Sequence, residues 1–246
     1  MREASPLLSV VIPAYNEEGR IATTLAAVRA YLQHALPEAE VIVVDDGSED
    51  ATAQVVEKIS SEPGVPVRLI RNRDNHGKGY SVRQGALAAQ GDLVLFTDAD
   101  LSTPIEDLER LRRALEEERA DVAIGSRNLP QARAGVQRPW YRELMSRAFN
   151  LAVRLILVPG FSDTQCGFKL FTREAARELF SRQLLDRWSF DAELLFLARK
   201  RGLRVVEVPV RWEYSSATRM KFLRNAVQML CDLFRVRWND LRRRYD

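Results

Sequence analysis

Short apolar runs rich in β-branched residues alternate with helical patterns along the first half of the chain. Five such runs lie at residues 8–13, 40–44, 67–71, 93–97 and 121–125. After the first run, apolar residues recur every three or four positions at Ile21, Leu25, Val28 and Leu32, which is the spacing of one helix face. Parallel strands need helical crossovers of this kind, and helices on both faces of a sheet bury its apolar strands. The sequence therefore predicts an α/β fold with a mostly parallel central sheet.

The second half of the chain has longer helical patterns. Helices are expected at residues 140–158, 173–180, 190–201 and 220–241. A strand is expected at residues 204–211, where Pro209 favours a sheet edge because proline donates no ladder hydrogen bond. The stretch PGFSDTQCGFKLF, residues 159–171, is expected to be irregular. We expect one large domain over residues 1–215, followed by a basic amphipathic helix over residues 216–246.

Charge, cysteine content and hydropathy narrow the class of protein. The formal net charge of +3 is mild, so no nucleic-acid partner is expected. Cys166 and Cys231 are too few for a zinc site or a disulfide framework. No run of about 18 uncharged apolar residues occurs, as a membrane-spanning helix would need. The first apolar stretch is too short for a secretion signal, and a cytoplasmic location is expected.

Acidic residues follow three of the expected strands. Glu17 and Glu18 follow the first, Asp45 and Asp46 end the second, and Asp98 and Asp100 follow the fourth, in the stretch LVLFTDADLSTP. In a parallel sheet these acids meet at one edge, where ligands bind. Converging carboxylates need a cation or hydrogen-bond donors between them. An Asp-x-Asp pair offers hard oxygen ligands to Mg²⁺ or Mn²⁺, which in turn bind a diphosphate; the alternative is that the acids cap helices or turns.

The stretch NHGKGYSVRQG, residues 75–85, has the composition of a phosphate-facing loop. Gly77 and Gly79 allow close backbone approach, and Lys78 and Arg83 bring positive charge near a helix N-terminus. The spacing matches neither an ATPase P-loop nor a dinucleotide-binding fingerprint. A glycine-containing turn with solvated cations is the alternative interpretation.

Five ordered motifs carry a resemblance to a known family. They are SVVIPAYNEEGRI, VIVVDDGSEDAT, NHGKGYSVRQGALAAQGDLVLFTDADLSTP, IGSRN and DTQCGFKLF. In this order and spacing, over residues 9–214, they resemble the inverting glycosyltransferases of family 2, which have the glycosyltransferase-A fold. Within that family the chain is similar to the dolichyl- and polyprenyl-phosphate sugar synthases. The stretch RWSFDAELL, residues 187–195, is more similar to their β-glucosyl branch than to the mannosyl branch.

The resemblance implies a donor site and a metal site. The nucleotide would be held by Pro13, Ala14, Tyr15, Asn16 and Glu17, its base by Asp45 and Asp46, and the rest of the donor by Lys78, Arg83, Ala99 and Arg219. Asp98 and Asp100 would hold Mg²⁺ or Mn²⁺ on the diphosphate. Ser102 stands where some members have a third ligand, often glutamine, and its shorter side chain leaves room for water. Arg219 stands in Ala-Thr-Arg, where the family pattern has Gly-Ser-Lys.

The implied reaction moves a hexose, expected to be glucose from UDP-glucose, to a polyprenyl or dolichyl phosphate with inversion. Arg127 would lie near the diphosphate and the acceptor phosphate. Asp191 and Glu193 stand where related transferases have an acidic pair near the acceptor and would supply an acceptor-side base, although a surface helix face explains them equally well. The alternatives are a GDP-mannose donor, a polysaccharide or soluble hydroxyl as acceptor, and a nucleotide-sugar-binding protein without turnover.

Two amphipathic segments are candidates for contact with a membrane surface. Residues 140–158 and 220–234 each combine a wide apolar face with neighbouring arginines, as interfacial helices do. Peripheral attachment to the cytoplasmic membrane face is expected, and self-association through the last helix is a second use of the same surface. Packing of both segments in the core, with solvated basic ends, is the alternative.

Overall fold

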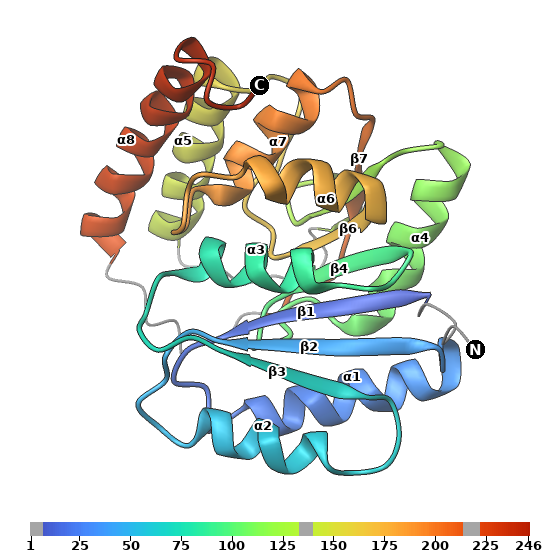
Figure 1. The fold of residues 1–246 in the computed structure, drawn as a ribbon. Coiled ribbons are helices and arrows are strands. Elements are labelled where there is room, and N and C mark those ends of the chain that lie inside the picture. Colours follow the sequence, from blue (N-terminus) through green and yellow to red (C-terminus); the bar gives the residue numbers. More distant parts are fainter. Residues whose placement is uncertain (1–6, 133–139, 214–221) are drawn as a thin grey trace.

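The structure is a computed structural model that describes residues 7–132, 140–213 and 222–246 (Figure 1). The strands are β1 (Leu8–Ala14), β2 (Ala39–Asp45), β3 (Val67–Arg71), β4 (Leu93–Thr97), β5 (Val122–Ser126), β6 (Phe168–Thr172) and β7 (Val205–Pro209). The helices are α1 (Ile21–Ala35), α2 (Thr52–Ser60), α3 (Lys78–Ala88), α4 (Leu108–Glu117), α5 (Trp140–Ile156), α6 (Arg173–Arg182), α7 (Phe190–Lys200) and α8 (Phe222–Leu241). Short 3₁₀ turns lie at Ile105–Asp107 and Pro130–Ala132.

The described strands form one sheet in the order β3-β2-β1-β4-β6-β5-β7. Strands β1 to β4 are mutually parallel, and β7 is parallel to β5. Strand β6 is antiparallel to both of its neighbours, β4 and β5. The predicted α/β class with a mostly parallel sheet is therefore confirmed, and β7 lies at the edge that Pro209 indicated.

Strand β6 is the element that the sequence did not predict. Its residues are FKLFT, and most of them were expected to belong to the irregular stretch 159–171. In the structure Lys169 is 1% exposed and its ammonium group lies 2.5 Å from a carboxylate oxygen of Asp191. The buried counter-charge allows a lysine inside a central strand, where hydropathy alone disfavours it.

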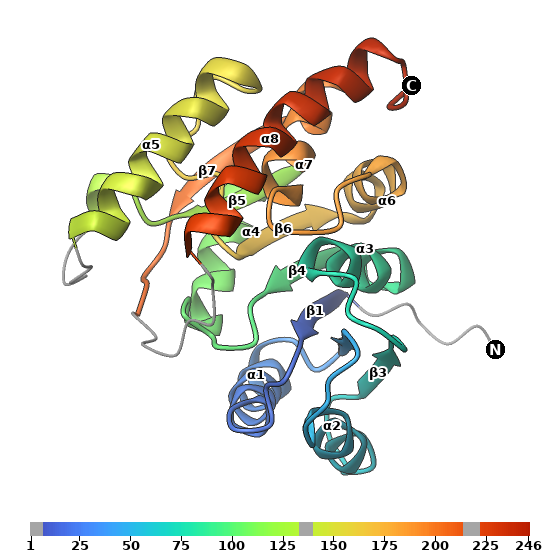
Figure 2. The ribbon, with the colours of Figure 1, turned by 90° about the vertical axis from the view of Figure 1, so that its left-hand side faces the viewer.

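Helices cover both faces of the sheet and form two cores. One core packs α1, α2 and α4 against inward side chains such as Val10 and Ile12, and the other packs α3 and α5 to α8 against Val11 and Ile42. Neighbouring strand residues thus point to opposite faces, as expected for strands buried on both sides. Figures 1 and 2 show α1 and α2 on one side of the sheet and α3, α6 and α7 on the other.

Helices α5 and α8 lie side by side at one end of the molecule in both views (Figures 1 and 2). Helix α8 contacts α5 and α7, and it contributes Leu233 and Val236 to the core. Arg237 of α8 donates to the carbonyl oxygen of Ile156 at the end of α5, at 2.6 Å. Among the described residues, no helix combines the length and hydropathy that crossing a bilayer requires. Whether residues 216–246 form a separable unit stays a prediction.

Candidate functional site

The acids at the ends of β1, β2 and β4 meet at one edge of the sheet, as the sequence predicted. The parallel register places Ala14 of β1 beside Asp45 of β2, and Val11 of β1 beside Phe96 of β4. Asp98 therefore follows β4 at the edge where β1 and β2 also end. The carboxyl edge of a doubly covered sheet is the usual ligand site of such folds.

The loop that carries Asp98 and Asp100 is held tightly. Leu101 has a φ of +45°, a left-handed conformation that costs energy for leucine and is retained only when its surroundings enforce it. The enforcing contacts are local: Thr24 donates its hydroxyl to the Ala99 carbonyl oxygen at 2.6 Å, and the Ser102 amide donates to Asp100 at 3.0 Å. Both carboxylates are thus presented from a fixed turn, although the side chain of Asp98 is still 33% exposed.

Lys78 stands opposite Asp98. Its ammonium nitrogen lies 2.6 Å from Oδ1 of Asp98 and packs over the rings of Phe96 and Trp188. Burial alone would lower the pKa of Lys78, but the carboxylates of Asp98 and Asp191 outweigh it and raise the pKa above its usual value. The lysine therefore stays charged, and the NHGKG loop places this cation at the acidic edge; its contact with a phosphate stays a prediction.

A glycine that the sequence analysis did not single out lies directly behind Asp98. Thr97 and Phe168 are the last pair of the β4–β6 ladder, and Gly167, directly before Phe168, lies against the Asp98 side chain. A Cβ atom on Gly167 would lie 2.5 Å from Cγ of Asp98, which is an overlap. The absence of a side chain at Gly167 therefore creates the space that the Asp98 carboxylate occupies.

The loop after β1 is tied to the loop after β2. Asn16, with a φ of +55°, donates its amide to the Ser48 hydroxyl at 2.9 Å and accepts from the Glu49 amide at 2.8 Å. The Glu17 amide donates to Thr52 at 2.7 Å. Ala14 is buried, Pro13 is half-buried and Tyr15 is 38% exposed. Of the five residues predicted to hold a nucleotide, Tyr15 thus offers the most open surface, whereas Asn16 and Glu17 organise the loop.

Asp45 and Asp46 differ in their environments. Asp46 accepts from Asn72 and from the amides of His76 and Gly77, at 3.0, 3.1 and 2.7 Å. Both of its oxygens therefore order the stretch that carries Lys78, residues 75–85, which we call the lysine loop. Asp45 keeps one oxygen without a hydrogen bond, 3.7 Å from Arg71.

A shallow pocket of about 250 Å³ adjoins these aspartates. It is lined by Gly47, Ser48, Arg71, Asn72 and Arg73. Its polar and cationic lining suits a small polar ring such as a nucleobase.

Two of the predicted site residues are engaged by protein groups. Arg83 donates to the carbonyl oxygen of Gln183 at 2.9 Å and forms an ion pair with Asp186 at 2.9 Å. Asp191 is buried against Lys169, whose ammonium group also donates to the Cys166 carbonyl oxygen. Burial raises the pKa of Asp191, and Lys169 acts in the opposite direction. Arg219 lies outside the described residues.

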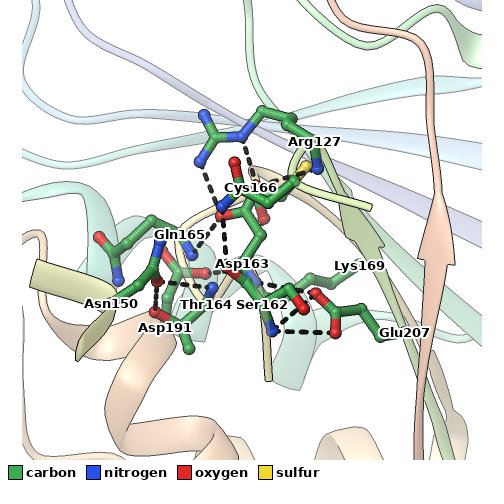
Figure 3. Close-up of polar contacts among 11 residues, drawn as sticks. Arg127, Asn150, Ser162, Asp163, Thr164, Gln165, Cys166, Lys169, Asp191 and Glu207 are labelled. Atoms are coloured by element: carbon green, nitrogen blue, oxygen red, sulfur yellow. Dashed lines mark hydrogen bonds and ion pairs between the residues drawn. The ribbon is translucent and has the colours of Figure 1, made fainter. Parts of the chain in front are cut away.

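Arg127 is held by a second residue that the sequence analysis did not single out, Asp163 (Figure 3). Its guanidinium group donates to both oxygens of Asp163, at 2.6 and 2.8 Å, and its amide donates at 3.0 Å. Burial alone would raise the pKa of Asp163, but Arg127 outweighs it and lowers the pKa to about 2. The amide of Asp163 is bound in turn by Glu207 of β7 at 2.8 Å. The signal available in the sequence was the aspartate at the start of DTQCGFK.

The donor set fits a hard divalent cation held jointly with a ligand. Asp98 and Asp100 offer carboxylate oxygens from one fixed turn, which is the chemistry that Mg²⁺ and Mn²⁺ prefer. Within the described ranges, no cluster of three or more acidic, histidine or cysteine side chains has the arrangement of a self-sufficient metal site. Two carboxylates would leave coordination positions for phosphate oxygens and water, and the half-buried Ser102 lies next to this shell.

The mostly parallel sheet with helices on both faces is the fold class that the resemblance to glycosyltransferases implied. Residues 9–180 match Glycosyl transferase family 2. The chain belongs to this family, as the ordered motifs indicated.

Curated relatives match most of the chain. A dolichyl-phosphate β-glucosyltransferase of Drosophila melanogaster is 41% identical over 240 residues, which cover 93% of this chain and 74% of the relative. The enzyme of the same description from Dictyostelium discoideum is 36% identical over 244 residues, covering 95% of this chain and 75% of the relative. The chain is thus similar to dolichyl-phosphate β-glucosyltransferases over nearly its whole length.

Solved structures share the fold at lower identity. Mannosyl-3-phosphoglycerate synthase from Rubrobacter xylanophilus superposes with a TM-score of 0.67 at 23% identity, covering 98% of this chain and 76% of the other. Glucosyl-3-phosphoglycerate synthase from Mycobacterium tuberculosis, in complex with Mn²⁺ and UDP-glucose, gives 0.65 at 21% identity, covering 95% and 78%. These similarities establish the glycosyltransferase-A fold.

Proposed function

We propose that the chain transfers glucose from UDP-glucose to a dolichyl or polyprenyl phosphate with inversion at the anomeric carbon. The observation that carries the proposal is the pairing of Asp98 with Lys78 at the carboxyl edge of β4, 2.6 Å apart, beside Asp100. The pair combines the groups that bind a metal and an anionic diphosphate in one place. The names of the curated relatives support glucose and a lipid phosphate as the two partners.

In this proposal the donor lies along the edge of the sheet. The base occupies the pocket beside Asp45, where Ser48, Arg71 and Asn72 present polar groups. Tyr15 covers the nucleotide. Asp98 and Asp100 would hold Mg²⁺ or Mn²⁺, which, when bound, supplies positive charge to the diphosphate. The Mycobacterium tuberculosis enzyme, which shares the fold, was solved with Mn²⁺ and UDP-glucose, and this supports a divalent metal and a nucleotide-sugar donor.

The reaction needs little proton transfer. An anionic oxygen of the acceptor phosphate attacks the anomeric carbon in line, the bond from that carbon to the diphosphate oxygen breaks, and its electron pair leaves with the nucleoside diphosphate. Lys78 stabilises the negative charge that grows on the leaving group. In this proposal Arg127, oriented by Asp163, holds the acceptor phosphate, so catalysis depends on position and charge.

A hydroxyl acceptor would require a general base, and Asp191 is the candidate for that role. A hydroxyl must lose a proton during attack, so a general base is needed, whereas a phosphate anion needs none. The carboxylate of Asp191 already binds the Lys169 ammonium group at 2.5 Å. This contact favours a positioning role for Asp191 and therefore favours the phosphate acceptor.

The proposal is tested by one assay on the purified protein. UDP-glucose, Mn²⁺ or Mg²⁺ and a short polyprenyl phosphate are expected to yield lipid-linked glucose, and addition of EDTA should reduce the rate to background. Parallel reactions replace UDP-glucose with GDP-mannose, or the polyprenyl phosphate with a soluble sugar, to test the alternative donor and acceptor. If no lipid-linked sugar forms, or if its rate is insensitive to EDTA, the proposed reaction or its metal requirement is wrong.

An exposed apolar face on α5 and α8 supports peripheral attachment to a membrane. We define it by Leu151 and Leu155 of α5 and by Val227, Leu230, Phe234, Trp238 and Leu241 of α8, which are 41–78% exposed. On α8 these residues follow helical spacing, opposite the buried Met229 and Val236. Exposed arginines supply charge complementary to anionic headgroups: Arg154 on α5, Arg235 on α8 and Arg242 directly after α8. An apolar face with a basic rim is typical of helices that lie in a membrane interface.

A double substitution on this face is expected to detach the protein from lipid. Phe234→Glu with Trp238→Glu should weaken binding to vesicles of phosphatidylcholine and phosphatidylserine by at least about tenfold, because two large apolar side chains no longer enter the interface. Co-sedimentation measures the loss, and Leu87→Glu on the exposed side of α3 is the matched control. UDP binding should be unchanged. A concentration-dependent dimer that the same change dissociates would instead identify this face as a self-association surface.

A further inference from the structure

Tyr245 is fully buried although it lies beyond the end of α8. After α8 the chain turns back toward α7 (Figure 1), and the Tyr245 ring packs near that of Phe196. Its hydroxyl donates to Oε1 of Glu193 on α7 at 2.6 Å. The carbonyl oxygen of Tyr245 accepts from Arg201 at 2.5 Å, so side chain and backbone are both fixed. This residue therefore has a defined position inside the protein.

Glu193 uses both carboxylate oxygens. Besides Tyr245, it accepts from the amides of Leu184 and Leu185, at 3.0 and 2.9 Å. The Tyr245 hydroxyl and both backbone amides donate hydrogen bonds to Glu193. An ionised carboxylate can accept all three, whereas a glutamine side chain would turn an NH₂ donor toward one of them. Burial raises the pKa of Glu193 to about 7, and the three donors act in the opposite direction. The carboxylate thus fixes the backbone of residues 184–185 from the side of α7 and α8.

Residues 183–186 form the wall against which the lysine loop packs. The Gln183 side chain donates to the Gly79 carbonyl oxygen at 2.9 Å, and the Tyr80 amide donates to the Asp186 carbonyl oxygen at 3.0 Å. A Cβ atom on Gly79 would lie 2.7 Å from the carbonyl oxygen of Leu185, so the two backbones are in direct contact. A Cβ atom on Gly77 would likewise lie 2.6 Å from the carbonyl oxygen of Asp186, so Lys78 stands between contact points at Gly77 and Gly79.

We propose that Tyr245 and Glu193 are positioning residues for the donor site, acting through residues 183–186 on Lys78. The chain of contacts runs from the Tyr245 hydroxyl to the Glu193 carboxylate, to the amides of residues 184–185, and to the backbone on either side of Lys78. Helix α8 would then carry the exposed apolar face and, through the turn that follows it, fix the cation that meets the diphosphate. The inference rests on the proposed function in taking Lys78 as a donor-binding group.

The coupling of Tyr245 and Glu193 to Lys78 is tested with the substitutions Tyr245→Phe and Glu193→Gln. Tyr245→Phe removes one hydroxyl, and Glu193→Gln turns an amide donor toward a backbone amide. Each is expected to weaken the binding of UDP with Mn²⁺, measured by calorimetry, by about three- to tenfold, the range of a coupling that acts through intermediate residues. In the transfer assay the KM for UDP-glucose should rise by the same factor, while the KM for polyprenyl phosphate stays constant.

A spectroscopic readout follows the loop itself. The Trp188 ring lies 5.5 Å from the Lys78 ammonium group, so displacement of the loop should change its fluorescence. The difference between Tyr245→Phe and the wild type should vanish when both also carry Trp188→Phe. Asp246→Asn is the matched control, because Asp246 lies next to Tyr245 but pairs with Lys200 at the surface. This control should bind UDP as the wild type does.

Two results would overturn the inference. The first is wild-type UDP affinity and Trp188 fluorescence in both variants, measured well below their melting temperatures. The second is an equal loss of UDP affinity in the Asp246→Asn control, which would mean that any disturbance of the segment after α8 weakens UDP binding. If the wild type binds UDP with Mn²⁺ but transfers no glucose to lipid, the proposed function is wrong. The UDP affinities of the variants and the wild type would still test whether Tyr245 and Glu193 position Lys78.

Discussion

Asp98→Ala is expected to lower the rate of sugar transfer by about 10³-fold or more, because it removes a metal ligand and the partner of Lys78 together. Asp98 stands at the open end of β4, and its Oδ1 lies 2.6 Å from the Lys78 ammonium nitrogen. In the proposed site the metal on the diphosphate would lose a ligand, and Lys78 would lose its ion-pair partner. The measurement is the single-turnover rate of lipid-linked glucose formation at saturating Mn²⁺.

Gly167→Ala should approach the same loss without removing any charged group. An alanine methyl at this position would overlap the Asp98 carboxylate, with Cγ only 2.5 Å away, so the side chain of Asp98 must turn aside. Asp92→Ala controls for loss of an acid, because Asp92 precedes the opposite end of β4 and is exposed. Gly19→Ala controls for a glycine, since nothing lies within 4 Å of its added Cβ. Transfer by Gly167→Ala within about threefold of the wild type would refute a positioning role for the glycine.

The parallel half of the fold could be predicted from the sequence because each strand and helix there is locally consistent. The apolar runs of β1, β2 and β4 are continuous, and the helix spacing between them is regular. Acids placed directly after these strands must meet at one edge once the strands are parallel neighbours. The convergence of Asp45 and Asp98 therefore followed from topology, without any knowledge of long-range contacts.

The central strand β6 could not be predicted by the same reasoning, because its stability comes from partners distant in sequence. Lys169 is acceptable in the sheet only because Asp191, 22 residues later, lies against it. Gly167 and Asp163 have a role only through Asp98 and Arg127, 69 and 36 residues before them. Local propensity contains no information on such pairs, and tertiary contacts decide them.

Arg83 shows a further limit of motif reasoning. Its charge and its place in the lysine loop indicated a phosphate contact, yet its guanidinium group binds Gln183 and Asp186. Arg83 thus joins the lysine loop to residues 183–186, the two segments that surround Lys78. Composition shows that a loop is cationic, whereas only the fold shows which cation faces the ligand.

Asp163→Asn is expected to lower the free energy of unfolding by about 3 kcal/mol at neutral pH, because it leaves the Arg127 guanidinium, whose side chain is only 16% exposed, without its counter-charge. Asp163 is 0% exposed and binds Arg127 through both oxygens. The measurement is urea unfolding of both proteins, followed by circular dichroism. Transfer activity should fall as well, since Arg127 would no longer be held in one orientation.

The pH dependence of this difference identifies the charge as its source. The pKa of Asp163 is lowered from 3.8 to about 2 in the folded protein, so the stability it contributes is present above about pH 4 and is lost as the pH falls toward 2. The difference between wild type and Asp163→Asn should therefore shrink by about 2 kcal/mol over this interval. A double-mutant cycle with Arg127→Gln separates the pair from the rest of the network, and a coupling of at least about 2 kcal/mol is expected. A pH-independent difference with no coupling would mean that Asp163 stabilises the protein through its backbone contacts alone.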